Sequence, residues 1–86
     1  MNIDEAIAKA KALGLYVGDR VTFTNWIHKR IEIEILRSTF SQGITSNVRV
    51  VATGEIATVG RAELVQWLAQ PDTEVQRMGT KEEVKI

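Results

Sequence analysis

Residues 30–37 read Arg-Ile-Glu-Ile-Glu-Ile-Leu-Arg, and this stretch decides the fold class. Three isoleucines alternate with two glutamates, which is the period-two pattern of a strand with one buried face. A helix would spread the isoleucines around its circumference. We therefore expect a strand whose core face carries Ile31, Ile33 and Ile35, with the glutamates on the outer face.

A second alternating stretch, residues 20–25, precedes this strand. Placing Phe23 opposite Ile31 joins the two stretches in a hairpin whose loop runs from Asn25 to Lys29. The same register sets Arg20 opposite Glu34 on the outer face, which is a favourable cross-strand pair of opposite charges.

An antiparallel meander is expected to continue from the central strand. That strand should run to about Thr39 and turn at Gln42-Gly43, because glycine adopts positive φ at no steric cost. Such a turn pairs Ile35 with Val50. It places three further residues on the core face, namely Val48, Val50 and Ala52. After a turn at residues 53–55, a short strand over residues 56–59 completes the meander.

Two helices flank the predicted strands. The first, residues 3–13, has apolar residues at helical spacing, Asn2 as its cap and Gly14 at its end. The second, residues 61–70, has one apolar stripe, formed by Leu64, Trp67 and Leu68. Residues 72–78 are expected to form either one more helical turn or a surface arm.

These elements predict an α+β fold. It is a two-layer sandwich of helix, four-stranded antiparallel meander and helix, with both helices on one sheet face. The alternative is a small SH3-like or Sm-like barrel with terminal helices, suggested by the run from Gly18 to Phe23. We expect one domain over residues 1–78 and a flexible C-terminal tail over residues 79–86, which are charged and poor in apolar side chains.

Composition excludes several classes of function. The chain has 86 residues, with eleven basic side chains balancing eleven acidic ones, so no global field favours nucleic acid or an anionic membrane. Because there is no cysteine, disulfides, thiolate zinc sites and a cysteine nucleophile are excluded. The sequence has no signal-peptide pattern and no apolar run of about 20 residues, so we expect a cytoplasmic protein without a membrane segment.

Catalytic residues are sparse. His28 is the single histidine, so no histidine cluster can hold a metal, and no phosphate-binding loop motif is present. Glu32 and Glu34 share one strand face, but carboxylates that alternate with buried isoleucines are usually the solvated half of a strand. We therefore expect no enzyme activity, no metal and no cofactor.

The loop of the first hairpin is one candidate binding site. It combines an aromatic ring with cations at Trp26, His28, Lys29 and Arg30. Cations contact phosphates and an exposed ring stacks on bases, so this loop is a candidate site for nucleic acid or another ligand. In the alternative interpretation, Trp26 and Ile27 fold back over the end of the sheet.

The outer face of the sheet is the other candidate. The predicted register gathers Leu36, Val51 and Ile56 there, beside Arg49. An uncovered apolar patch with a polar rim is typical of a partner-binding surface or a homodimer interface. Alternatively, the chain from Asp72 onward covers this face.

The sequence thus predicts a small non-catalytic binding module that acts through protein–protein contact at the outer face. Its partner is another protein or a second copy. Adaptors and inhibitors of this kind include proteins encoded by phages and mobile elements. The alternative is a nucleic-acid-binding domain that uses the loop at residues 26–30.

Overall fold

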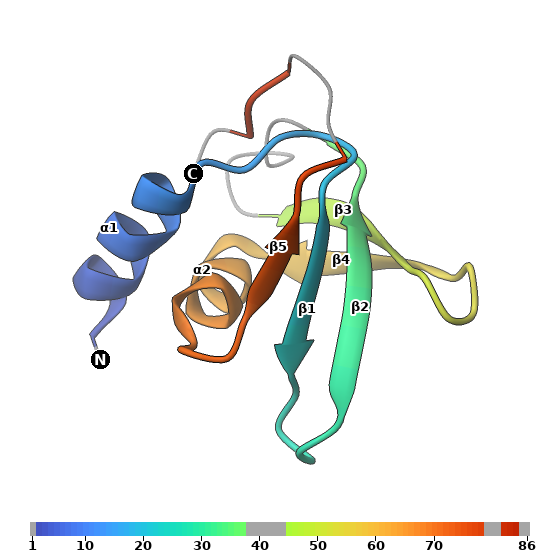
Figure 1. Ribbon diagram of the computed structural model, residues 1–86, viewed down its shortest axis with the longest axis horizontal. Helices are drawn as coiled ribbons and strands as arrows, with labels where there is room; N and C mark the ends of the chain where they lie inside the picture. Colours follow the sequence, from blue (N-terminus) through green and yellow to red (C-terminus); the bar gives the residue numbers. More distant parts are fainter. Residues whose placement is uncertain (1, 38–44, 79–81, 85–86) are drawn as a thin grey trace.

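The computed structural model describes residues 2–37, 45–78 and 82–84, which form two helices and five strands (Figure 1). In chain order the elements are α1 (Ile3–Leu13), β1 (Arg20–Thr24), β2 (Arg30–Ile35), β3 (Thr45–Val50), β4 (Ile56–Gly60), α2 (Arg61–Ala69) and β5 (Glu74–Gln76). The strands make one antiparallel sheet in the order β4-β3-β2-β1-β5. The predicted α+β class is confirmed, with a fifth strand in addition. Neither described helix is long and apolar enough to cross a membrane.

Local sequence sets both ends of α1, as predicted. The Asn2 side chain accepts a hydrogen bond from the Glu5 backbone N–H at 2.8 Å, which satisfies one of the free donors of the first turn. Gly14 follows the helix with a φ of 66°, a left-handed conformation that costs glycine little. Leu15 directly after it is buried, so the chain turns back into the core at once.

The hairpin of β1 and β2 has the predicted register and the predicted loop, residues 25–29. Its outer-face ion pairs differ from the prediction. Arg20 lies opposite Glu34 along the backbone, but its guanidinium is 3.9 Å from the Glu32 carboxylate. Glu34 pairs instead with Arg49 of β3, at 3.0 Å. A long arginine side chain reaches a diagonal neighbour as readily as the residue directly opposite.

The pairing of β2 with β3 is shifted by two residues from the predicted register. Ile33 lies opposite Val50 and Ile35 opposite Val48, whereas the prediction paired Ile35 with Val50. Side chains alternate with a period of two, so an even shift keeps every residue on its predicted face while changing its neighbours. Val48 is accordingly buried.

The ends of these strands also differ from the prediction. β2 ends at Ile35 rather than near Thr39, and the predicted Gln42-Gly43 turn lies outside the described residues. Ala52, predicted on the core face, is exposed in the turn between β3 and β4. The turn begins this early because the Gly54 backbone N–H donates to the Val50 carbonyl at 2.7 Å, which ends β3 there.

The segment over residues 72–78 contains β5, which pairs antiparallel with β1 and sets Val75 opposite Val21. The sequence predicts either one more helical turn or a surface arm here, and the observed strand is neither of these. β5 is three residues long and holds one apolar side chain, so its sequence has no alternating pattern from which a strand could be predicted.

Residues 82–84 lie against the rest of the chain, although the sequence analysis placed them in a flexible tail. The Val84 backbone N–H donates to the Leu15 carbonyl at 2.7 Å, and Val17 N–H donates to the Glu82 carbonyl at 2.9 Å. Val84 is buried in the core cluster. A single buried valine among charged neighbours gave no periodic signal.

The core lies between α2 and the inner face of the sheet. α2 contacts β1 and β4, and α1 packs mainly against α2, so both helices lie on one side of the sheet, as predicted (Figure 1). The Phe23 and Trp67 rings stack with centroids 4.1 Å apart. The buried side chains of α2 are Leu64, Val65, Leu68 and Ala69.

A buried carboxylate joins three parts of the fold. Asp19 is fully buried, and it accepts hydrogen bonds from the backbone N–H groups of Tyr16 at 3.0 Å and Met78 at 3.2 Å. Arg77 Nε lies 3.3 Å from the same carboxylate. The Arg77 guanidinium also donates to the last carbonyls of α1 and lies over the Tyr16 ring. Burying a charge is tolerable because this one is paired and hydrogen-bonded.

The barrel alternative requires β4 to pair with β5. Among the described residues these two strands are the unpaired edges of the sheet. α2 joins them in the chain and contacts both β4 and β1 across the inner face. The sheet is therefore open.

Candidate functional site

The residues considered for catalysis are dispersed or already paired. Glu32 and Glu34 lie in ion pairs with Arg20 and Arg49, and His28 is exposed in the loop between β1 and β2. Within residues 2–37, 45–78 and 82–84, no group of three histidine, aspartate or glutamate side chains is placed to hold a metal ion. The arrangement offers no general acid–base pair.

The outer face of the sheet is arranged in rows across the strands. The central row contains Glu34, Arg49 and Ile56, from β2, β3 and β4. The Arg49 guanidinium is 3.0 Å from the Glu34 carboxylate, and the Ile56 side chain beside it is half exposed. This row is charged at its centre.

Leu36 and Val51, the other apolar residues of the predicted partner surface, lie on opposite sides of that row. The Leu36 N–H donates to the Asn47 carbonyl, and the Val51 N–H donates to the Glu32 carbonyl. Four residues of register separate them, roughly 13 Å along a strand. The two-residue shift between β2 and β3 thus keeps Leu36, Val51 and Ile56 from forming one cluster.

The loop between β1 and β2, residues 25–29, is called the Trp26 loop from here on. Asn25 Oδ1 accepts hydrogen bonds from the backbone N–H groups of Ile27 at 3.1 Å and Lys29 at 2.9 Å. The Asn25 backbone also bonds to Lys29 and His28. His28 has a φ of 64°, which a non-glycine residue adopts at a cost of roughly 1–2 kcal/mol. One asparagine side chain therefore holds the loop in a defined conformation.

Trp26 stands at the tip of this loop and is 89 % exposed. The alternative in which it folds back over the end of the sheet is wrong. Ile27 beside it is also exposed. Figure 1 shows the loop projecting from the end of the β1–β2 hairpin at the bottom of the view. One of the two tryptophans of the chain thus lies in water, at a protruding point.

The end of α2 fixes the base of the Trp26 loop. Gln70 Oε1 accepts from the Thr24 backbone N–H at 3.2 Å, and Gln70 Nε2 donates to the Thr24 carbonyl at 3.0 Å. β5 pairs only with residues 20–22 of β1. The Gln70 amide therefore continues the pairing of β1 beyond the start of β5, up to Thr24, the last residue before the loop.

Arg30, the cation at the other side of the base, is engaged within the fold. Its guanidinium is 3.1 Å from Asp72 and 3.8 Å from Glu74, and it donates to the Thr24 hydroxyl. The hydrogen bond from the Thr24 hydroxyl, at 2.7 Å, and the charge of Arg30 hold the pKa of Asp72 below its ordinary value. Two carboxylates thus balance Arg30, while Lys29 and His28 are exposed.

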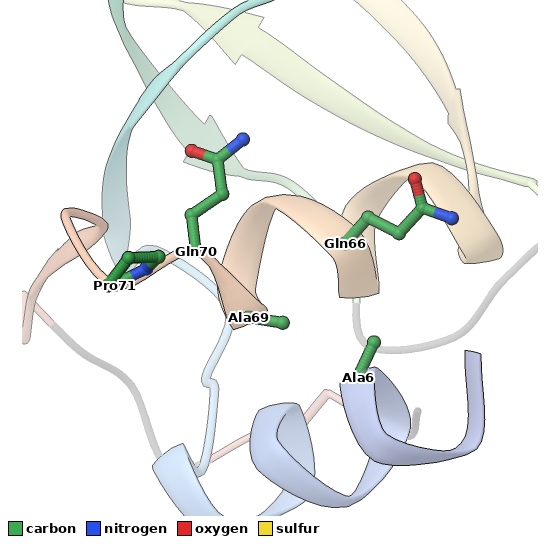
Figure 2. Close-up of a pocket in the computed structure, with 5 residues that line it drawn as sticks. All are labelled: Ala6, Gln66, Ala69, Gln70 and Pro71. Atoms are coloured by element: carbon green, nitrogen blue, oxygen red, sulfur yellow. The ribbon is translucent and has the colours of Figure 1, made fainter. Parts of the chain in front are cut away.

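An open groove of about 420 Å³ lies between α1 and α2 (Figure 2). It is lined by Ala6, Gln66, Ala69, Gln70 and Pro71. The Gln70 amide is directed away from α1, because it bonds to Thr24. No charged side chain is among these lining residues, and the Gln70 amide is engaged elsewhere, so the groove offers few groups to orient a polar ligand.

Comparisons of the chain with protein-family models, with curated proteins and with solved structures found no match. The function is therefore inferred from the geometry of the Trp26 loop and of the sheet.

Sequence reasoning identified Trp26, His28, Lys29 and Arg30, but not the residues that hold them in place. Asn25 carried a usable signal, since asparagine side chains commonly bond to the backbone two residues on. Gln70 and Asp72 carried none, because they are 46 and 48 residues from Thr24 in the chain.

Proposed function

We propose that this protein is a small non-catalytic module, of adaptor or inhibitor type, that binds another protein through the Trp26 loop. The observation that carries the proposal is the 89 % exposure of Trp26. Tryptophan is enriched among the few interface residues that dominate binding energy. The loop replaces the outer face as the main contact, because charged side chains separate the apolar residues there.

The rigidity of the loop supports this proposal. Binding costs the freedom of each side chain and loop that must be ordered, so a contact held in place beforehand binds more tightly. The Asn25 side chain accepts hydrogen bonds from the Ile27 and Lys29 backbone, and Gln70 fixes Thr24 at the base of the loop. Trp26 is presented on a backbone that needs no further ordering.

The chemistry of the tip indicates what the partner offers. Trp26 and Ile27 need an apolar pocket, and exposed Lys29 favours an acidic group at its rim. A partner with an apolar cleft bordered by carboxylates fits these three side chains.

Single-stranded nucleic acid is the second candidate, because the exposed ring of Trp26 is also suited to stacking on a base. The charge around it favours protein instead. Asp72 and Glu74 balance Arg30, which leaves Lys29 as the one lysine or arginine of residues 25–30 that these two carboxylates do not balance. Phosphate binding generally draws on several such cations.

Capture from a lysate of the native host, with and without nuclease treatment, tests the proposal. Trp26→Ser should weaken binding by roughly 30-fold or more, the loss typical of an anchor residue worth about 2 kcal/mol. Met78→Ser is the matched control, since Met78 is also exposed and apolar but lies beside Asp19, at the end of β1 opposite the loop. It should bind like the unchanged protein.

Two outcomes would contradict the proposal. In the first, nuclease treatment abolishes capture, and the complex is sensitive to salt and is lost in Trp26→Ser. This result would indicate the nucleic-acid function. Capture that Trp26→Ser leaves unchanged removes the loop from the interface. Gln70→Ala adds a separate check: it touches no partner, yet it should weaken binding because the base of the loop is released.

A further inference from the structure

β4 is an open edge of the sheet, and it lacks the features that usually protect such an edge. Natural edge strands avoid pairing with other chains through charged side chains, prolines or bulges. Residues 56–60 read Ile-Ala-Thr-Val-Gly, with neither a charge nor a proline. Ile56 is half exposed, and Thr58 is exposed.

The hydrogen bonds of β4 show which backbone groups face outward. The Val50 N–H donates to the Glu55 carbonyl at 2.8 Å, so residue 55 and alternate residues after it face β3. The next N–H group, that of Val51, donates to Glu32 of β2 instead. Successive backbone groups of β3 thus point alternately to β4 and to β2, with Val50 pointing to β4. The N–H and C=O groups of Ile56 and Thr58 therefore point to the open edge.

We propose that β4 pairs antiparallel with β4 of a second copy of this chain, with Thr58 on the two-fold axis. In this register the outward-facing groups of Thr58 bond to those of Thr58 in the other copy. Ile56 then lies opposite Gly60, where the missing side chain leaves room for it, and Ala57 lies opposite Val59. The interface is the same patch on both copies, as two-fold symmetry requires.

The charges at the ends of β4 are complementary in this register. Glu55 precedes the strand and Arg61 follows it. Because both are three residues from Thr58, antiparallel pairing brings Glu55 of each copy to Arg61 of the other. The two-fold axis produces this contact twice. A shift of register in either direction would separate the opposite charges, so they specify one alignment as well as the partner.

The described elements leave this edge uncovered. α2 starts at Arg61 but turns back across the inner face, and Gln70 at its end bonds to Thr24 of β1. Figure 1 shows α2 beside β5, where it starts directly after β4. Pairing two copies would join their sheets into one continuous sheet.

Sedimentation of the full chain over a range of concentrations tests the proposal. The unchanged protein should form a dimer reversibly. Thr58→Pro should be monomeric and folded, because the N–H that it removes faces the open edge, where proline is tolerated. A protein that stays monomeric up to its solubility limit, or a folded Thr58→Pro that still dimerises, would overturn the proposal.

Charge exchange provides a test that does not depend on the fold of the proline variant. Glu55→Arg and Arg61→Glu each place like charges in contact twice, so each alone should dimerise roughly tenfold more weakly or worse. Mixed in equal amounts, the two variants should form a heterodimer of nearly the original affinity, since opposite charges then meet at both contacts. Equal affinities for the two variant homodimers and the heterodimer would show that Glu55 and Arg61 do not meet.

Discussion

Asp19→Ala removes the carboxylate that joins β5 and the end of α1 to the turn before β1. The N–H groups of Tyr16 and Met78 lose their acceptor, and Arg77 loses its counter-charge. Asp19 is fully buried while the Arg77 side chain is 47 % exposed. Arg77 can therefore recover hydration, but the space left by the carboxylate cannot admit solvent without opening the packing around it.

The expected cost is large relative to the stability of the domain. Removing the acceptor leaves the part-buried N–H groups of Tyr16 and Met78 unsatisfied, at roughly 1–3 kcal/mol each. A domain of this length has a free energy of unfolding of about 4–13 kcal/mol in total. Asp19→Ala should therefore remove a large part of the stability of the domain, with β5 released first because, among the described strands, it pairs with β1 alone.

Urea denaturation followed by far-ultraviolet circular dichroism measures this cost. Glu34→Ala is the matched control, because its ion pair with Arg49 lies on the solvated outer face and should contribute less than about 1 kcal/mol. Arg77→Ala should fall between the two. Equal losses in Asp19→Ala and Glu34→Ala would refute the argument that the Asp19 carboxylate holds these segments together.

Two further predictions concern the C-terminal half of the chain. Val84→Asp should destabilise the fold by at least about 2 kcal/mol in the same assay, because it buries an unpaired carboxylate in the core. Glu83→Ala, at an exposed position, should not destabilise it. Similar urea midpoints for the two variants would place residue 84 outside the core. The depressed pKa of Asp72 means that the unfolded chain binds the proton first as pH falls. The stability advantage over Asp72→Asn should therefore be fully present above the ordinary pKa of 3.8 and be lost as the pH falls from there through the lower pKa of the folded state; a difference that persists in still stronger acid would contradict this.

The features predicted correctly from the sequence depend on short stretches of chain. α1 follows from Asn2, Gly14 and the apolar spacing between them. The β1–β2 register follows from one short loop, because a five-residue connection leaves few ways to align Phe23 with Ile31. In both cases the determining residues are close together, so local rules suffice.

The features that were missed depend on contacts between distant segments. β5 exists because Val75 meets Val21 across more than fifty residues, and no pattern in three residues reveals that. The β2–β3 register was predicted from a presumed two-residue turn, and the actual pairing lies two residues away. An even shift keeps the residues of β2 and β3 on their predicted faces, so the predicted core face remains correct. The shift separates Leu36 from Ile56, so the predicted partner surface is not formed.

The Trp26 loop was found from its composition, but its relevance depends on exposure, which composition does not determine. An aromatic residue in a hairpin loop either packs on the sheet or faces solvent. Here the Asn25 side chain holds the backbone of Ile27 and Lys29, and Trp26 faces solvent. The distant Gln70 then fixes the base, which a local reading of the loop cannot include.

The two proposed contact surfaces share no residue, and this separates their tests. The Trp26 loop connects β1 and β2, while the open edge of β4 lies beyond β3 in the sheet. Failure of the β4 pairing therefore leaves partner binding by the Trp26 loop unaffected, and the reverse also holds. If both operate, each dimer carries two Trp26 loops, and a partner with two suitably spaced pockets would be held by avidity without any new contact. The weak pairing expected of one short edge strand would then be reinforced by the partner, so that assembly and binding favour each other.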